Sequence, residues 1–279
     1  MQAVNSIDKN IFCPIKKIPA WRCQKNNMSD IKYSDKVLEE VPVAIIYNGI
    51  SYVVLMAIAD SLEDLSIGFS LTEGIVDQYH DIRDVVTQTH SFGIEIHIEI
   101  SSRCFHRLKR RQRNMTGKTG CGICGIERLS QVVRPLSQLP ETLKIPINKI
   151  EKSFLQLQEK QSFFAQTGGS HAAGFINSQG KLVEIREDIG RHIALDKLIG
   201  SIIRQNLSGG SILITSRASY EMVQKVITAK IEALFAISAV THMAVDLAQK
   251  YHLTLAGFCR NDQCNIYAGK SRILNGSAV

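Results

Sequence analysis

The sequence predicts an α/β protein made of two units, a smaller α+β unit followed by a larger α/β unit. Three observations support this. Strand-like and helix-like segments alternate through the second half of the chain, a strong hairpin signal opens the first unit, and a polar, proline-spaced stretch near residue 140 separates the two. We therefore divide the chain into residues 1–38, 39–140 and 141–279, and expect the first segment to be an irregular extension.

The first unit opens with a predicted hairpin. Two apolar runs, VPVAIIY and ISYVVLMAI, are joined by Asn48-Gly49, the dipeptide that supplies the positive φ angles of a type I′ turn. Ser61 is placed to cap a following helix, and Gly74 is placed to end it. Residues 93–100 alternate isoleucine with polar side chains, which predicts a half-buried strand.

The second unit opens with a predicted helix over residues 149–161 and a hairpin that turns at residues 178–180. Asp188 is a natural N-cap for the next helix. The rest of the unit alternates: SILIT, FAISA and LTLAGF predict strands, and SYEMVQKVITAKIEAL and THMAVDLAQKY predict helices. This order is typical of βαβ units and a largely parallel sheet.

Composition limits the class of protein. Hydrophobic residues make up 44% and charged residues 21% of the 279 residues, as in ordinary globular proteins. The most apolar region, residues 233–245, is too short to span a membrane, and the N-terminus lacks a signal-peptide pattern. We expect a cytoplasmic protein without membrane contact. Seven cysteines then indicate thiols, metal ligands or catalysis, and the net charge of +7 indicates an acidic or phosphorylated partner.

A glycine-rich loop, GKTGCGICG over residues 117–125, is the sharpest feature. It places Cys121 and Cys124 two residues apart in an adaptable backbone. A thiolate at such a position accepts the outer sulfur of a persulfide and passes it on, while a second cysteine protects, resolves or relays it. Cations nearby, which favour the thiolate, are Arg113, Lys118 and Arg128.

Other interpretations of this cysteine pair remain open. As a metal site, the pair would supply half of the ligands of a zinc ion. The only other close pair is Cys259 and Cys264, whose spacing is loose for zinc. A thioredoxin-like exchanger would place its cysteines between a strand and a helix, whereas here the surroundings are glycine-rich and basic. Two inert exposed thiols would be an oxidation liability. We expect no bound metal.

The segment before the loop is strongly basic, with seven Lys or Arg between residues 103 and 118. It is either a solvated helix face or a positive arm that attracts pyrophosphate groups or an acidic protein surface. Phe105 is its only aromatic residue, so nucleic acid is a poor match.

Three further segments could contact a ligand. The stretch TGGSHAA places His171 before an apolar strand, where it could line a pocket or be purely structural. The stretch DIGRH lies where a helix should begin, and free N–H groups there could receive a phosphate. Ser216 and Arg217 follow a predicted strand, at the edge of an open α/β sheet where ligands bind, although simple capping is the alternative.

Together these segments resemble the FdhD family, the sulfurtransferases required for formate dehydrogenase activity. The similar stretches span roughly residues 39–270 and occur in one order: EVPVAIIYNGIS, IGFSLTEGI, TGKTGCGICG, TGGSHAA, EDIGRHIALDKLIG, TSRASYEMVQK and LTLAGF.

The resemblance implies an enzyme that relays sulfur. A cysteine desulfurase would load Cys121 as a persulfide, with Cys124 as its partner residue in a mobile loop. The protein would pass the sulfur to the molybdenum of the bis-(molybdopterin guanine dinucleotide) cofactor, bound as acceptor, for apo-formate dehydrogenase. The resemblance also implies a homodimer and no zinc.

The family's cofactor-binding stretch corresponds to residues 258–263, beyond the last long strand. This stretch is Phe258, Cys259, Arg260, Asn261, Asp262 and Gln263. Family members often end it with a basic residue, and this chain has Gln263 instead. We add His171, Ser216 and Arg217 as expected cofactor contacts. Some relatives carry a third cysteine in TGGSHAA, and its absence here argues against a role in transfer.

The resemblance further implies a second unit similar to cytidine deaminases. His192 remains where a deaminase holds zinc, but the catalytic glutamate and both cysteines are missing. Such a fold cannot deaminate and is available as a nucleotide-binding surface. Two alternative functions remain: a zinc-dependent adaptor that docks on formate dehydrogenase, and a plain thiol oxidoreductase.

Overall fold

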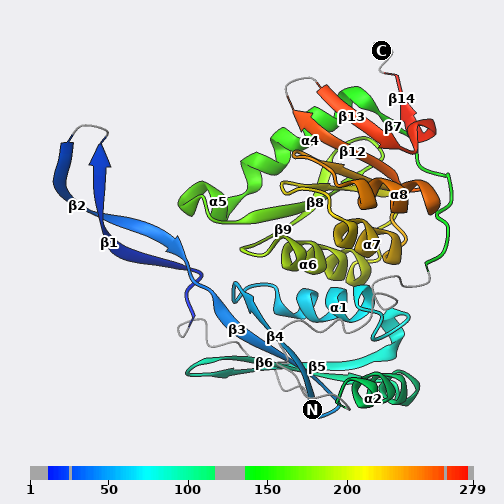
Figure 1. The fold of residues 1–279 in the computed structure, drawn as a ribbon, viewed down its shortest axis with the longest axis horizontal. Helices are drawn as coiled ribbons and strands as arrows, with labels where there is room; N and C mark the ends of the chain where they lie inside the picture. Colours follow the sequence, from blue (N-terminus) through cyan, green and yellow to red (C-terminus); the bar gives the residue numbers. More distant parts are fainter. Residues whose placement is uncertain (1–11, 25–26, 117–135, 261–262, 276–279) are drawn as a thin grey trace.

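The computed structural model describes residues 12–24, 27–116, 136–260 and 263–275. Two sheets lie one above the other with helices between them, and a two-stranded ribbon extends away from this body (Figure 1). None of the helices in these described ranges is long and apolar enough to cross a bilayer.

The ribbon pairs β1 (Ile15–Gln24) with β2 (Asn27–Leu38) in antiparallel register. The expectation of an irregular N-terminal extension is therefore wrong for this segment. Ile18 and Trp21, two of its described side chains, are 43% and 62% exposed, so part of its apolar surface faces solvent. A strand pair in solvent on both sides needs no alternation of apolar and polar residues, so the pattern that identifies a half-buried strand is missing.

The lower sheet has the strand order β4-β3-β6-β5. Asn48 and Gly49 have φ angles of 45° and 80°, as the predicted type I′ turn requires. The isoleucines of residues 93–100 are buried, which confirms the predicted half-buried strand. The elements of this part are β3 (Val41–Tyr47), β4 (Ile50–Ala57), α1 (Leu62–Thr72), η1 (Tyr79–Asp81), β5 (Ile82–His90), β6 (Gly93–Ile100) and α2 (Ser102–Thr116).

The upper sheet has six strands in the order β13-β12-β11-β10-β8-β9. Its centre, β10 to β12, is parallel, while β8 and β13 run antiparallel to their neighbours, so the largely parallel sheet predicted is confirmed only for the centre. The strands are β8 (His171–Asn177), β9 (Leu182–Asp188), β10 (Gly210–Ile214), β11 (Ala233–Ala236), β12 (Thr254–Arg260) and β13 (Gln263–Ala268).

Helices cover both faces of this sheet. Alternate strand residues separate the two cores: Ile212 and Ile214 pack with α6, α7 and α8, while Leu213 packs with α4. The helices and remaining short elements are β7 (Ile145–Pro146), α4 (Ile147–Lys160), α5 (Ser162–Thr167), α6 (Arg191–Arg204), α7 (Tyr220–Thr228), α8 (His242–Lys250), η2 (Lys270–Arg272) and β14 (Ile273–Leu274).

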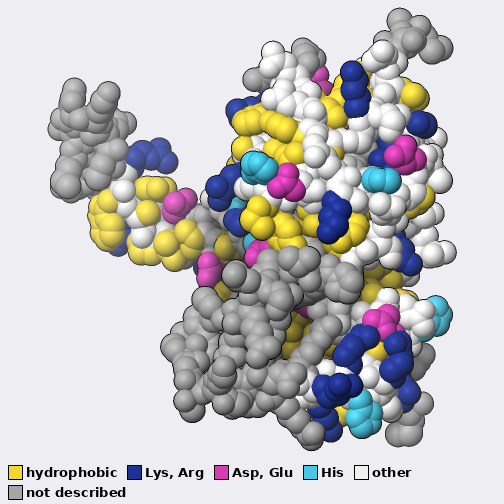
Figure 2. All heavy atoms as spheres, turned by 45° about the vertical axis from the view of Figure 1, so that its right-hand side comes forward, with side chains coloured by type: hydrophobic (Ala, Val, Ile, Leu, Met, Phe, Trp, Pro, Cys, Tyr) yellow, Lys and Arg dark blue, Asp and Glu magenta, His cyan; other side chains and the backbone are white. Residues whose placement is uncertain are grey.

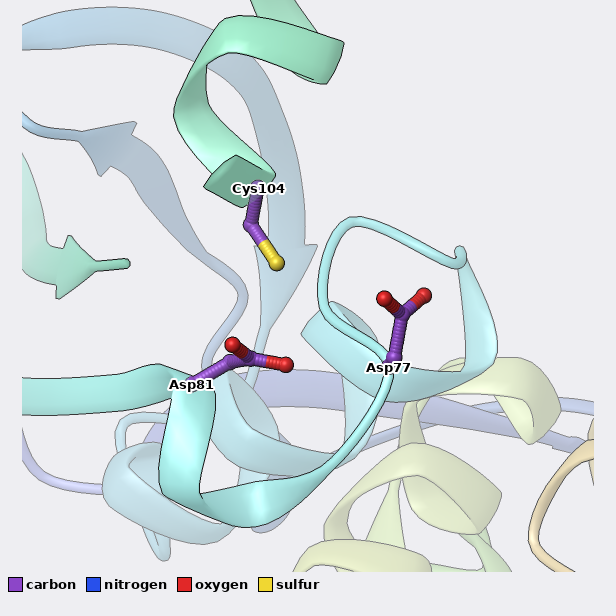
Figure 3. Close-up of side chains that lie close together, drawn as sticks. All are labelled: Asp77, Asp81 and Cys104. Carbon is purple, nitrogen blue, oxygen red and sulfur yellow. The ribbon is translucent and has the colours of Figure 1, made fainter. Parts of the chain in front are cut away.

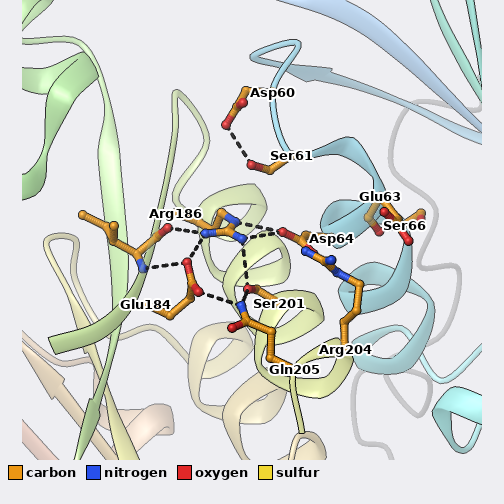
Figure 4. Close-up of polar contacts among 11 residues, drawn as sticks. Asp60, Ser61, Glu63, Asp64, Ser66, Glu184, Arg186, Ser201, Arg204 and Gln205 are labelled. Carbon is orange, nitrogen blue, oxygen red and sulfur yellow. Dashed lines mark hydrogen bonds and ion pairs between the residues drawn. The ribbon is translucent and has the colours of Figure 1, made fainter. Parts of the chain in front are cut away.

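The two halves of the body meet where α1 crosses α6. Gly68 and Gly200 lie at this crossing, and a Cβ atom on either would collide with the backbone of the other helix. The absence of both side chains therefore lets the helices approach closely. Beside the crossing, Arg186 of β9 reaches Asp64 of α1 at 2.6 Å, and Arg204 reaches the same carboxylate at 2.8 Å (Figure 4).

Two local predictions differ from the structure. The helix predicted through Leu234 ends at Thr228, because Lys230 takes a left-handed φ of 59° and residues from Ala233 onward pair with β10 and β12. Asp188 does not cap α6. The N-cap is Gly190, and the Asp188 carboxylate is buried against Lys197 instead.

Candidate functional site

The cysteine loop itself, with Cys121 and Cys124, lies outside the described residues. The helix that leads into it is described: α2 carries the first part of the predicted basic segment. Lys and Arg side chains gather on the molecular surface where this helix lies (Figure 2). The loop is therefore approached from a positively charged helix.

Acidic residues anchor the first turn of α2. Arg103 contacts Asp77 at 2.5 Å and Asp81 at 3.0 Å, and Arg107 contacts Asp77 at 2.8 Å. The Arg107 hydrogen bond lowers the pKa of Asp77, with Arg103 adding to the effect, and a hydrogen bond from Ser101 does the same for Asp81, assisted by Arg103. These contacts fix where the basic helix begins.

The same carboxylates, with Cys104, form a group compact enough to suggest a metal site, since their ligand atoms lie within 4.8 Å of one another (Figure 3). Both carboxylates already face guanidinium groups, and Arg107 Nη2 lies 3.7 Å from Cys104 Sγ. A cation there would have to displace two arginines. We therefore interpret the group as the anchor of α2.

A second group of polar residues collects at one edge of the six-stranded sheet. The strands β10, β11 and β12 end at this edge, β8 begins there, and β9 ends there. The helices α6, α7 and α8 begin beside it, so their free N–H groups lie close by. This is the edge at which open α/β sheets bind ligands.

His171 lies in this edge, beside Thr215 and against a cavity of about 450 Å³. Thr215 Oγ1 accepts the N–H of Ala172 at 2.9 Å, which ties the end of β10 to the start of β8. Burial lowers the pKa of His171, and the neighbouring Arg191 guanidinium lowers it further. The imidazole is thus held in its neutral form, able both to donate and to accept a hydrogen bond.

Ser216 and Arg217 follow β10 at the same edge but differ in exposure. Ser216 is buried and donates to the carbonyl of Arg217 at 3.1 Å, whereas the Arg217 side chain is exposed. The buried Ser216 hydroxyl is used within its own turn. Arg217 has no ion pair with the residues that the structure describes.

The starts of α6 and α7 carry two buried polar side-chain atoms that matter for the edge. Arg191 Nε and Ser219 Oγ have no hydrogen-bond partner within the described ranges. His192 Nε2 lies 2.9 Å from Glu221 Oε2, although its pKa is lowered because burial outweighs that carboxylate. Such atoms are rarely left unsatisfied in proteins, so this corner of the edge suits a polar ligand.

The expected cofactor stretch lies at the end of the β12–β13 hairpin. Phe258 has a left-handed φ of 53°, and its N–H reaches the carbonyl of Ser238 at 3.0 Å, which bends the strand. Cys259 is buried, while Arg260 and Gln263 are exposed. The residues between them, Asn261 and Asp262, fall outside the described ranges.

The sequence-predicted ligand contacts are therefore only partly brought together. His171 lines the cavity over the second half of α4, whereas Cys259 and Gln263 line a separate cavity over its first half. The sequence indicated the two stretches that contain Arg191 and Ser219 as possible anion sites, but it did not single out these two side chains. The only signal for them was their place at the expected helix starts.

The fold and the site together define a mixed α/β protein with a polar edge on an open sheet and a basic helix that precedes a cysteine pair in the sequence. The chain belongs to the FdhD/NarQ family, whose model matches residues 38–274. The fold is similar to the crystal structure of a protein from Desulfotalea psychrophila assigned as a formate dehydrogenase accessory protein. That match has a TM-score of 0.72 and 21% identity, and covers 93% of this chain and 99% of the other.

Proposed function

We propose that this chain is a sulfurtransferase that acts in formate dehydrogenase maturation. It accepts sulfur from a cysteine desulfurase and passes it to the molybdenum of bis-(molybdopterin guanine dinucleotide), which is its substrate. Membership of the FdhD/NarQ family over residues 38–274, a range that includes Cys121 and Cys124, is the observation that carries this proposal.

The chemistry begins with a thiolate. The Cys121 thiolate attacks the outer sulfur of the desulfurase persulfide, forms a new S–S bond, and expels the desulfurase cysteine as a thiolate. Cys121 then carries one additional sulfur. Cys124, three residues further along the chain, assists release of the sulfur. A cationic neighbourhood favours the thiolate form that this exchange requires.

Charge supports a large anionic substrate. The cofactor carries two pyrophosphate groups, and the chain presents the basic helix α2 before the loop. At the sheet edge, Arg191, Arg217 and Arg260 add three cations among the described residues. Arg191 Nε and Ser219 Oγ, which have no hydrogen-bond partner among the described residues, supply donors for phosphate or base oxygens.

We extend the proposal to the architecture. A cytidine-deaminase-like second unit is supported by His192 at the start of α6 beside the ligand edge. The segments GRHIALDK and SRASYEMV contain no cysteine, so the edge would bind a nucleotide portion without zinc. A homodimer in the cytoplasm completes the proposal.

The test is formate dehydrogenase activity in cells that lack their own accessory protein. Expression of the wild-type chain should restore activity, and Cys121→Ala should abolish it. Cys13→Ala, a change at an exposed cysteine far along the chain from the loop, is the matched control and should restore activity fully. Restoration by Cys121→Ala would eliminate the carrier role.

The zinc-adaptor alternative takes Cys259 and Cys264 as the second pair of ligands beside the loop cysteines. These two sulfurs are bonded to each other in the structure, and a disulfide sulfur is not a thiolate ligand. Zinc binding at this pair would therefore require that the disulfide is first reduced.

A further inference from the structure

Two cysteines face each other across the end of the β12–β13 hairpin. Cys259 and Cys264 are joined by a disulfide, and their Cα atoms lie 4.2 Å apart. They are close because the two strands are neighbours in the sheet, so the backbone would keep the sulfurs adjacent even when the bond is open. Each sulfur therefore meets the other at a high effective concentration.

The pair is accessible from one side. A cavity of about 240 Å³ lies between the start of α4 and the hairpin end. Cys259 is 2% exposed and packs in the core beneath α4, whereas Cys264 is only partly buried. The cavity wall is formed by Ile147, Asn148, Ile150, Glu151, Cys259, Gln263 and Cys264.

We propose that Cys259 and Cys264 are a reversible dithiol–disulfide couple that exchanges with low-molecular-weight thiols of the glutathione type, with Cys264 as the sulfur that is attacked. The cavity provides the entry path. The burial difference sets the direction, because an incoming thiolate needs access to the sulfur opposite the leaving group.

The exchange is balanced in both directions. In reduction, a glutathione thiolate attacks Cys264 Sγ and expels Cys259 as a thiolate, and a second glutathione thiolate then attacks the mixed disulfide and expels Cys264. The cysteines gain two electrons and two protons, and one glutathione disulfide is formed. Oxidation is the reverse, with glutathione disulfide as the oxidant.

The bond lies where the strand pairing is irregular. Gly257 pairs with Asn265 and Arg260 pairs with Gln263, but the register shifts between these pairs. The disulfide therefore ties the strands across a break in the ladder, and it brackets Arg260 and Gln263. Any effect of this disulfide on cofactor binding by Arg260 and Gln263 rests on the proposed function. The dithiol–disulfide couple itself does not depend on that function.

Trypsin offers a direct test, because Arg260 lies between the two cysteines. Cleavage places Cys259 on the peptide of residues 251–260 and Cys264 on that of residues 261–270. The full-length protein is equilibrated in mixtures of glutathione and glutathione disulfide, alkylated and digested. The ratio of linked to separate peptides should change about tenfold for each tenfold change in the ratio of squared glutathione to glutathione disulfide. A ratio that stays constant over the whole series would overturn the proposal.

Two variants test the direction. Cys259→Ser should trap glutathione on the peptide of residues 261–270, while Cys264→Ser should leave Cys259 unmodified, and the opposite pattern would overturn the entry at Cys264. The wild-type titration needs no variant, so misfolding cannot hide the answer. The loop cysteines lie on a third peptide, residues 119–128, so failure of sulfur loading there is scored separately.

Discussion

Asp188 and Lys197 form an ion pair that solvent does not reach. Their charged atoms are 2.7 Å apart, and both side chains are 0% exposed. Lys197 also donates to the carbonyl of Ile58 at 3.1 Å, and the Asp188 carboxylate accepts the Ile58 N–H at the same distance. This cluster joins β9, α6 and the segment before α1 directly behind the edge that carries His171.

Lys197→Met should destabilise the protein by about 3–5 kcal/mol, because it leaves the Asp188 carboxylate buried without its cation. Urea denaturation measures the free energy of unfolding. The double variant Asp188→Asn/Lys197→Met should recover part of the loss. As the control, Lys16→Met breaks a pair with Glu39 in which solvent reaches both side chains, at 49% and 21% exposure, and it should change stability by at most ~1 kcal/mol. Equal effects for the two single variants would show that burial of the pair is unimportant.

Gly68→Ala should also destabilise the protein. Alanine normally favours a helix interior by about 0.5–1 kcal/mol, but here its Cβ would overlap the backbone of α6. Separating the helices should cost about 1–3 kcal/mol, so the clash wins. Gly169→Ala is the comparison, because its Cβ would meet side-chain atoms alone, of which the nearest is Cδ1 of Leu38 at 3.3 Å. The melting temperatures of both variants, measured by thermal unfolding, test this prediction. A Gly68→Ala variant more stable than wild type would contradict the close approach of α1 and α6.

Asp81→Ala should loosen the start of α2. The change removes one carboxylate from Arg103 and the partner of Ser101, at a cost of about 1–3 kcal/mol. Amide hydrogen exchange within α2 should become faster. Arg110→Ala, at an exposed position further along the helix, should change stability by no more than about 0.5 kcal/mol. Unchanged exchange in Asp81→Ala would show that the acidic anchor does not hold the helix.

His171 should make stability fall as the pH drops. The pKa of His171 is 6.5 in an unfolded chain and lower in the folded protein. As the pH falls below 6.5, the unfolded chain therefore takes up a proton more readily than the folded protein, and the free energy of unfolding decreases. An NMR titration of the imidazole follows this pKa directly. Arg191→Gln should raise it by removing a nearby positive charge, whereas Arg217→Gln should leave it unchanged. If Arg217→Gln changed this pKa more than Arg191→Gln, Arg191 would not be the cation that lowers it.

Local signals predicted some elements of this fold well. The Asn48-Gly49 turn and the isoleucine alternation of residues 93–100 each depend only on residues close together in the sequence, and both are confirmed. The helix predicted through Leu234 was too long, because residues from Ala233 onward are apolar enough for either state and pairing with β10 and β12 decides for the strand.

Other features depend on partners distant in the sequence. Asp188 has the side chain of an N-cap, and only the fold brings Lys197 and Ile58 to its carboxylate. The spacing of Cys259 and Cys264 suggested at most a loose metal pair, whereas strand pairing makes them neighbours. The polar edge was predicted from strand and helix order, since Ser216 and Arg217 follow a strand end, and a pocket beside His171 was one of two interpretations of its stretch, whereas the cavity beside Cys259 was not predicted.

The central claim is that Cys121 carries sulfur, and intact-mass spectrometry tests it most directly. The purified protein is incubated with a cysteine desulfurase and cysteine, then weighed without reductant. Wild type and Cys13→Ala should gain the mass of one sulfur atom, and Cys121→Ala should gain none. No gain in wild type, or an undiminished gain in Cys121→Ala, would contradict the account.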